Sequence, residues 1–261
     1  MALDPIDTSQ PHPARMYDYY LGGKDSYPVD EDAAERVISF LPAIRVAART
    51  NRKFMSRAAR LLADRGVYQF LDIGTGIPTE PNLHQVVQAI NPQSRVVYVD
   101  NDPIVLRHAE ALLQSTSEGA TKYIEADVRE PEKIIEEAKE ILNFEKPVAL
   151  SLVALLHFVS DEYRPYDLVN ELLAPLPSDS FLTLSHVTGD FDAAGWEKAV
   201  EIYRKNGVPA QVRSRDEFAG FFTGLDLIEP GVQVVTQWHP EPDQEFNDER
   251  VPLYVGVAQK P

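Results

Sequence analysis

The sequence of 261 residues predicts an α/β fold with a mostly parallel, seven-stranded sheet. Two observations support this prediction. From residue 67 onward, short apolar runs alternate with longer amphipathic segments, and the apolar runs lack the polar alternation of a strand with one wet face. Repeated units of this kind give parallel strands that are joined by right-handed crossovers and covered by helices on both faces.

The chain divides into three predicted parts. Residues 1–13 are polar and rich in proline, so we expect a flexible tail. Residues 14–66 are expected to form an N-terminal helical cap or lid, with a short helical start, a Gly22–Gly23 break, and then two helices at residues 30–40 and 44–64. Residues 67–261 are expected to form the main domain.

The main domain is predicted as strands and helices in alternation. The strands are expected at residues 68–73, 95–99, 122–125, 148–152, 181–186, 232–238 and 253–258. The helices are expected at residues 81–90, 103–114, 131–142, 161–173, 196–206 and 215–222. The last two strands suit an antiparallel hairpin at one edge of the sheet.

Composition excludes several classes of function. The formal net charge of −16 disfavours nucleic-acid partners, because binding depends on basic side chains that neutralise phosphates. The chain has no cysteine, which excludes disulfides, zinc–thiolate sites and cysteine nucleophiles, and no His/Asp/Glu spacing is typical of a metal site. No apolar run is long enough to span a membrane, and the N-terminus does not resemble a signal peptide, so we expect a cytoplasmic protein without a membrane partner.

The first chemical motif follows the first predicted strand of the main domain. Asp72 is followed by Gly74, Thr75 and Gly76, and glycines at such a turn let the backbone approach a ligand closely. A dinucleotide fingerprint would need a third glycine where this chain has Thr79. A carboxylate here is unfavourable beside a pyrophosphate but suits a ligand with a cationic end. The alternative is a tight strand-to-helix turn with a capping aspartate.

Two more carboxylates end the next two predicted strands. Asp100 could accept hydrogen bonds from both hydroxyls of a ribose, with Asn101 beside it, or could cap the helix before Pro103. Asp127 could accept a hydrogen bond from an adenine amino group, and the backbone of Val128 could contact the ring edge. Three acids at the ends of successive strands indicate one binding site.

These motifs resemble those of a known family. The row of Asp72, Asp100 and Asp127 resembles the pattern of class I methyltransferases that use S-adenosylmethionine (SAM). Residues 13–24, 48–52 and 76–79 resemble, more narrowly, the actinobacterial S-adenosyl methyltransferase family, formerly a domain of unknown function. The resemblance covers nearly the whole chain. It implies a Rossmann-like class I methyltransferase fold, an N-terminal helical cap and SAM as the cofactor, but no acceptor. Residues 82–84 read Asn-Leu-His where members often have Asn-Val-His.

The resemblance also implies roles for individual residues. The segment from Tyr17 to Lys24 would form a lid over the cofactor, and Lys24 or Arg52 would hold the SAM carboxylate. The alternative is that the tyrosines pack on the sheet and that Lys24 is solvated. The expected cofactor-binding residues are Tyr19, Tyr20, Gly22, Lys24, Arg52, Asp72, Gly74, Thr75, Gly76, Asp100, Asn101, Asp127, Val128, Ser151 and Leu152.

The sequence indicates one candidate catalytic residue, whereas it indicates many candidate cofactor-binding residues. His157 follows the fourth strand and could act as a general base, although it could equally pack at a helix start. The acceptor would enter near Gly189, Phe191 and Trp196. We expect methyl transfer from SAM to a small-molecule acceptor. The alternatives are a nonenzymatic SAM-binding or regulatory protein and a nicotinamide-dependent oxidoreductase. The sequence shows no dimer interface.

Overall fold

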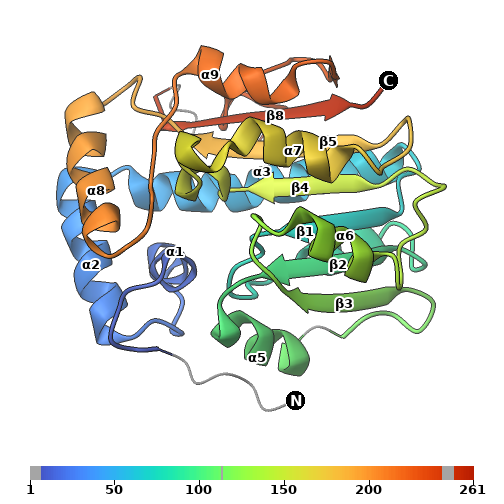
Figure 1. The fold of residues 1–261 in the computed structure, drawn as a ribbon, viewed down its shortest axis with the longest axis horizontal. Coiled ribbons are helices and arrows are strands. Elements are labelled where there is room, and N and C mark those ends of the chain that lie inside the picture. Colours follow the sequence, from blue (N-terminus) through green and yellow to red (C-terminus); the bar gives the residue numbers. More distant parts are fainter. Residues whose placement is uncertain (1–6, 113, 243–249) are drawn as a thin grey trace.

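The computed structural model describes residues 7–112, 114–242 and 250–261. It shows a sheet with the strand order β3-β2-β1-β4-β5-β8-β6, with β7 also paired to β8 (Figure 1). Strands β1 to β5 run parallel, and β8 runs antiparallel to its neighbours. The strands are β1 Gln69–Ile73, β2 Arg95–Asp100, β3 Ala120–Glu125, β4 Ala149–Val153, β5 Phe181–Val187, β6 Asp226–Leu227, β7 Gln233–Val234 and β8 Leu253–Gln259.

The late strands differ in detail from the predicted edge hairpin. The described residues form eight strands, because β6 and β7 are separate two-residue pieces that both pair with β8. Strand β8 consequently lies inside the sheet, between β5 and these short strands. A turn at Gly231, with a φ of 78°, separates the two pieces, and its N–H donates to the carbonyl of Ile228. The expected strand at 232–238 is therefore mostly loop.

Helices cover both faces of the sheet (Figure 1). Nine α-helices lie within the described residues: α1 Pro13–Leu21, α2 Pro28–Phe40, α3 Ile44–Asp64, α4 Leu83–Gln88, α5 Pro103–Leu112, α6 Pro131–Ala138, α7 Pro165–Leu173, α8 Ala193–Lys205 and α9 Arg215–Ala219. Three 3-10 turns, η1 Leu156–Phe158, η2 Asp161–Tyr163 and η3 Gly220–Phe222, complete the chain.

Two predicted helices are interrupted. The helix expected at 161–173 begins only at Pro165, because Arg164 has a φ of 52° and proline cannot donate a helical hydrogen bond. The helix expected at 215–222 ends at Ala219 and continues as the tighter turn η3. Helix α3, by contrast, has the predicted bounds of residues 44–64.

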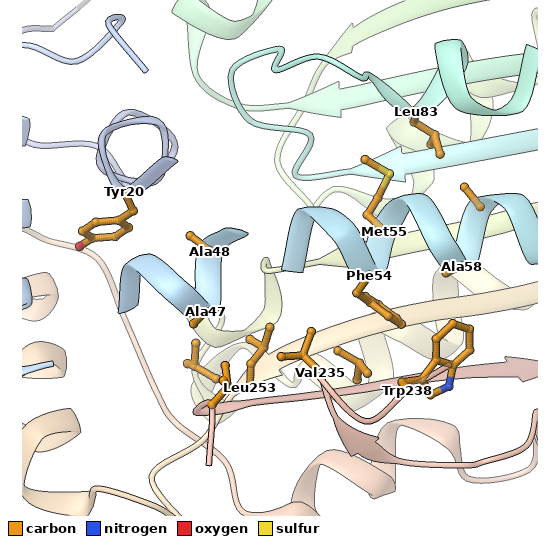
Figure 2. Packing of buried hydrophobic residues seen from close by; sticks show 14 of the residues in the cluster. Tyr20, Ala47, Ala48, Phe54, Met55, Ala58, Leu83, Val235, Trp238 and Leu253 are labelled. Atoms are coloured by element: carbon orange, nitrogen blue, oxygen red, sulfur yellow. The ribbon is translucent and has the colours of Figure 1, made fainter. Parts of the chain in front are cut away.

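A single hydrophobic cluster joins the N-terminal helices to the sheet (Figure 2). On α3, Phe54 packs edge-on against Trp238, with ring centroids 5.1 Å apart. Met55 on the same helix belongs to the cluster together with Leu83 of α4 and Leu253 of β8. Helix α3 therefore forms part of the layer on one face of the sheet, while α1 and α2 extend beyond the carboxyl ends of the parallel strands (Figure 1).

The N-terminal segment contacts the body of the protein from residue 7 onward. Residues 1–6 of the expected tail lie outside the described residues. Arg15, which is 3% exposed, donates to the carbonyls of Asp7 and Gln10, and His12 lies 3.0 Å from the carboxylate of Asp102. These contacts hold the start of α1 beside the loop that follows β2.

In the described part of the chain, no helix is long and apolar enough to cross a bilayer.

Candidate active site

A cavity of about 260 Å³ lies at the carboxyl ends of β1, β2, β3 and β4. Ligands of open α/β sheets bind at this edge, because the loops that follow the parallel strands meet there. Its floor is formed by these loops and its roof by α1 and α3. Nine of the predicted residues line it: Arg52, Asp72, Gly74, Thr75, Gly76, Asp100, Asn101, Asp127 and Val128.

The turn after β1 brings the backbone close to this cavity. Gly74 and Gly76 have φ angles of 75° and 68°, in the left-handed region that favours glycine. A Cβ on Gly74 would also lie 2.7 Å from the side chain of Leu155. The N–H of Gly74 donates to the carbonyl of Val99, and the N–H of Gly76 donates to Asp100 Oδ2 at 2.7 Å. The two glycines thus tie the turn to the end of β2.

Asp72 is a buried carboxyl that faces the cavity. It is the last residue but one of β1, opposite Ser151 on β4, and it is only 8% exposed. Burial raises the pKa of Asp72 to about 6, although Ser151 and the guanidinium of Arg52 favour its charged form. Since burying a charge is costly, this position is suited to a carboxylate that pairs with a cationic ligand group.

Asp100 also lies buried at the cavity, with a firmly held side chain. It accepts hydrogen bonds from the backbone N–H of Gly76 at 2.7 Å and of Asp102 at 3.0 Å. Burial raises the pKa of Asp100, and these two hydrogen bonds partly oppose the shift. Each bond orients one carboxylate oxygen, and further lone pairs remain for a ligand.

Asp127 is held by a residue that the sequence reasoning missed. Arg129 donates to both carboxylate oxygens of Asp127 at 2.7 Å, and Asn101 donates to Oδ2 at 3.0 Å. Burial alone would raise the pKa of Asp127, but the hydrogen bonds from Arg129 outweigh it and lower the pKa. Arg129 lines the cavity. The sequence feature that could have indicated it is its position two residues after Asp127, which was already a candidate binding residue.

The roof contributes a polar group without a partner. Tyr17 on α1 donates to the carbonyl of Ala48 and accepts from Asn51 Nδ2 at 2.9 Å. Asn51 is 2% exposed, and its Oδ1 has no hydrogen-bond partner. Arg52, one residue on, donates to the carbonyls of Thr79 and Pro81, so its guanidinium is held beside the turn after β1. Tyr17 was expected in a lid, whereas no role was assigned to Asn51.

Four residues expected in the lid do not reach this cavity. Tyr19 donates to Glu35 at 2.6 Å and lies beneath Arg45 at the surface. Gly22 and Lys24 are exposed, and Gly22, with a φ of 86°, ends α1. Tyr20 is buried and bonds to the hydroxyl of Tyr203 instead. The helical period of α1 explains this pattern, because Tyr17 and Tyr20 share its inner face and Tyr19 points outward.

Strand β4 shows the same effect of side-chain direction. Leu152 is fully buried in the hydrophobic core between the sheet and α7, while Ser151 lies beside Asp72 without lining the cavity. Val153, Ala154 and Leu155, the next residues, line the cavity instead. The predicted contact of β4 with the ligand is therefore displaced toward the loop.

His157 lies in turn η1, behind the main cavity. It is 7% exposed, and its Nδ1 has no hydrogen-bond partner. Burial lowers the pKa of His157 well below its ordinary value, and the neighbouring His186 and Arg213 lower it further. The imidazole is therefore neutral at physiological pH and available as a hydrogen-bond acceptor, while its low pKa makes it a weak base.

Arg213 fixes the turn that carries His157. It is 1% exposed and donates to the carbonyls of Leu156 and Val159 at 3.1 Å. It also contacts His186 Nε2 at 2.8 Å and the carboxylate of Asp161 at 2.6 Å.

In the part of the chain that the structure describes, no group of three or more His, Cys, Asp or Glu side chains could hold a metal ion.

Comparisons with known proteins agree with this geometry. The family model described as S-adenosyl methyltransferase matches residues 1–261. A DUF574 family protein from Streptomyces avermitilis is 45% identical, with a TM-score of 0.94 over 98% of this chain and 100% of that chain. A candidate methyltransferase from Thermobifida fusca is 35% identical, with a TM-score of 0.87 over 97% and 96% of the two chains. Comparison with the curated proteins finds no match.

A more distant structure shows the fold alone. A SAM-dependent methyltransferase from Anabaena variabilis is 16% identical, with a TM-score of 0.52 over 100% of both chains. This structure confirms the Rossmann-like class I fold expected from the sequence. The family model confirms the two other expectations, SAM as the methyl donor and methyl transfer as the activity. The chain belongs to the S-adenosyl methyltransferase family.

Proposed function

We propose that this protein transfers the methyl group of SAM to a small-molecule acceptor and that the cavity at the strand ends holds SAM. The observation that carries the proposal is the row of Asp72, Asp100 and Asp127, which lie at or just after the ends of three neighbouring strands and line one cavity. Neighbouring strands are about 4.8 Å apart, so the row suits an elongated ligand that lies across the strand ends.

The residues present fit SAM from one end to the other. Asp72 and the unpartnered Asn51 Oδ1 offer acceptors for the cationic amino group of the methionine end, and Arg52 would hold its carboxylate. Asp100 would accept from the ribose hydroxyls. Burying Asn51 Oδ1 and the charged form of Asp72 costs free energy in the unliganded protein. A ligand that donates hydrogen bonds to these atoms would offset that cost.

The adenine would lie at the end of β3. Asp127 is oriented by Arg129 and Asn101, so that its remaining lone pairs can meet the adenine amino group. Val128 is buried at the cavity wall and would contact the ring. In this order the methionine end lies at β1, beside β4 and η1.

The chemistry requires alignment more than acid–base work. SAM, when bound, supplies a methyl group on a positively charged sulfur that is a good leaving group. The chain holds the donor under α1 and α3, excludes water and presents the acceptor in line with the methyl group. Val153, Ala154 and Leu155 would border the reacting end.

The charge of the molecule supports a small acceptor. A net charge of −16 repels the phosphate backbone of nucleic acids. The cavity also lies beneath α1, with His12 and Tyr17 at its wall, and this partial cover suits a small acceptor better than a polymer. The cytoplasmic location stays a prediction from the sequence.

Transfer of a labelled methyl group tests this proposal. The protein and isotopically labelled SAM are incubated with a Streptomyces cell extract that has been separated by ultrafiltration into small-molecule and macromolecular fractions. We expect label in the small-molecule fraction, with strong loss in Asp100→Asn and none in the exposed control Asp32→Asn. Label in the macromolecular fraction would contradict a small acceptor. Undiminished transfer by Asp100→Asn would contradict the assigned cavity.

A further inference from the structure

A second, smaller cavity of about 40 Å³ adjoins the main cavity. The two cavities share Pro13, Tyr17, Asn51, Ala154 and Phe158 as lining residues. Beyond this shared wall, the smaller cavity is lined by residues from α1, α3, η1, α8 and the ends of β5 and β8. It therefore lies on the β4 side of the site, next to the proposed position of the methionine end.

Three buried polar atoms without partners belong to residues that line the smaller cavity. They are Asn51 Oδ1, His157 Nδ1 and Trp196 Nε1. Their residues are 2%, 7% and 3% exposed, so bulk solvent has little access to these groups. An unsatisfied buried donor or acceptor is costly, and such groups in a native protein need an explanation. A ligand that both accepts and donates hydrogen bonds would satisfy them.

The lining also restricts the charge of that ligand. None of the residues that line the smaller cavity is an aspartate, glutamate, lysine or arginine. A carboxylate or an ammonium group would be buried there without a counterion, at high cost. A hydroxyl is neutral, accepts from the indole N–H of Trp196, and donates to His157 Nδ1, while Asn51 Oδ1 would accept from the SAM amino group in the adjoining cavity.

We propose that the smaller cavity receives the reacting hydroxyl of the methyl acceptor, so that the product is a methyl ether. This inference rests on the proposed function and names the acceptor's chemical class. One water needs about 10–15 Å³ of such cavity volume, so a cavity of about 40 Å³ has room for the hydroxyl and the carbon that bears it but not for a whole acceptor molecule. The remainder of the acceptor would lie outside the smaller cavity.

His157 can orient the acceptor hydroxyl for this reaction by accepting its hydrogen bond. The acceptor oxygen forms a bond to the methyl carbon as the carbon–sulfur bond breaks, and the sulfur keeps the electron pair. The hydroxyl donates its hydrogen bond to His157 Nδ1, which has no other partner. Burial, His186 and Arg213 disfavour an imidazolium there, so the proton that the reaction releases passes on to solvent and the imidazole stays neutral. The positive charge of the sulfur leaves the site with this proton.

The two tryptophans of the chain provide a direct test with an internal control. Trp196 lines the smaller cavity and, on its other side, a surface pocket beside α8, whereas Trp238 is fully buried against Phe54 and lines neither the main nor the smaller cavity. The probes are ethanol, acetate and ethylammonium, which have similar sizes and different charges. Nuclear magnetic resonance of ¹⁵N-labelled protein follows both indole N–H groups, and Trp196→Phe assigns the Trp196 signal.

We expect ethanol to shift the Trp196 signal saturably at millimolar concentrations, because so small a ligand binds weakly. The Trp238 signal should stay in place, and acetate and ethylammonium should shift neither signal. The ring ¹⁵N signals of His157 give a second readout in the wild-type protein if Trp196→Phe does not fold. A Trp196 signal that ethanol leaves unmoved, or that all three probes shift alike, would overturn the assignment.

Calorimetry with SAM separates the two proposals. SAM binding without an ethanol shift at Trp196 would overturn the hydroxyl subsite and leave the cofactor assignment standing. An ethanol shift without SAM binding would support the hydroxyl pocket and overturn the proposed methyl transfer. Binding of both probes supports both assignments.

Discussion

At the scale of the residue, the site is marked by groups whose burial is costly in the free protein. Asp72 is the clearest case, because burial raises its pKa to about 6 while the carboxyl lies at the cavity. Asn51 Oδ1 and His157 Nδ1 are buried without partners. Perturbed and unsatisfied groups gathered in one cleft are typical of binding sites that are stabilised when the ligand arrives.

Asp72→Asn should stabilise the free protein at neutral pH. The folded pKa of Asp72 lies above its unfolded value of 3.8, so the folded state binds more protons and loses stability as the pH rises from about 4 to about 6. Asparagine does not titrate, so the variant does not lose this stability. We expect its free energy of unfolding at neutral pH to exceed that of the wild type by an amount on the order of 2–3 kcal/mol. Urea unfolding at pH about 7 and pH about 4 measures it, with Asp32→Asn as the control. A variant less stable than wild type at neutral pH would refute this account.

The same carboxyl should make SAM binding depend on pH. If the charged form pairs with the amino group, affinity falls as the pH drops below about 6, by up to tenfold per pH unit. Calorimetric titration with SAM at several pH values checks this. Asp72→Asn should bind more weakly and without this pH dependence. An unchanged dependence in the variant would assign the titration to another group.

At the scale of the element, the strands position the site and the loops shape it. The bounds of β1 to β5 follow closely from the apolar runs, and α3 follows from its long amphipathic repeat. The carboxylates that end successive strands were predictable for the same reason. The position of Arg164 in the left-handed region, which delays α7, was not, because no local pattern signals a positive φ in arginine.

The roof could not be predicted from sequence in the same way. Tyr17 lines the main cavity and Tyr19 does not, although both belong to one motif. The choice depends on how α1 packs against α3, and a short helix with several tyrosines gives no single apolar stripe from which to infer it. Arg129 was missed because its contact with Asp127 depends on the loop after β3.

The turn after β1 gives a matched pair of variants. Gly74→Ala and Gly76→Ala both place a side chain at a positive φ, which costs about 1–2 kcal/mol. Only at Gly74 would the new Cβ also meet Leu155, whereas nothing lies within 4 Å at Gly76. We therefore expect Gly74→Ala to lower the free energy of unfolding more than Gly76→Ala in urea titrations. Equal losses would show that Leu155 moves away without cost.

The loop after β4 depends on one buried cation. Arg213→Met leaves the carbonyls of Leu156 and Val159 without donors, and we expect a loss of about 3 kcal/mol in the free energy of unfolding. Arg213→Lys should recover little, because a single ammonium group cannot reproduce the planar fork that spans both carbonyls. Thermal and urea unfolding of both variants check this. Full recovery in the lysine variant would mean that charge alone holds η1.

At the scale of the whole molecule, residues from distant parts of the sequence close the site. Tyr20 of α1 and Tyr203 of α8 are 183 residues apart and join their hydroxyls at 3.1 Å beside the smaller cavity. The N-terminal helices, the parallel sheet and α8 thus all contribute to the proposed active site. Local motifs pointed to the carboxylate row and to His157 and Trp196, but not to the packing of α1, α3 and α8 that brings residues of all three helices around the smaller cavity.

Calorimetric titration with SAM and with NAD tests the central claim most directly. The wild-type protein, Asp100→Asn and the exposed control Asp32→Asn are compared at neutral pH. We predict that SAM binds to wild type and control alike, that NAD does not bind, and that Asp100→Asn binds SAM about tenfold more weakly or worse, as expected for the loss of charged hydrogen bonds. SAM binding that Asp100→Asn leaves unchanged, or tighter binding of NAD, would contradict the assignment of this cavity to SAM.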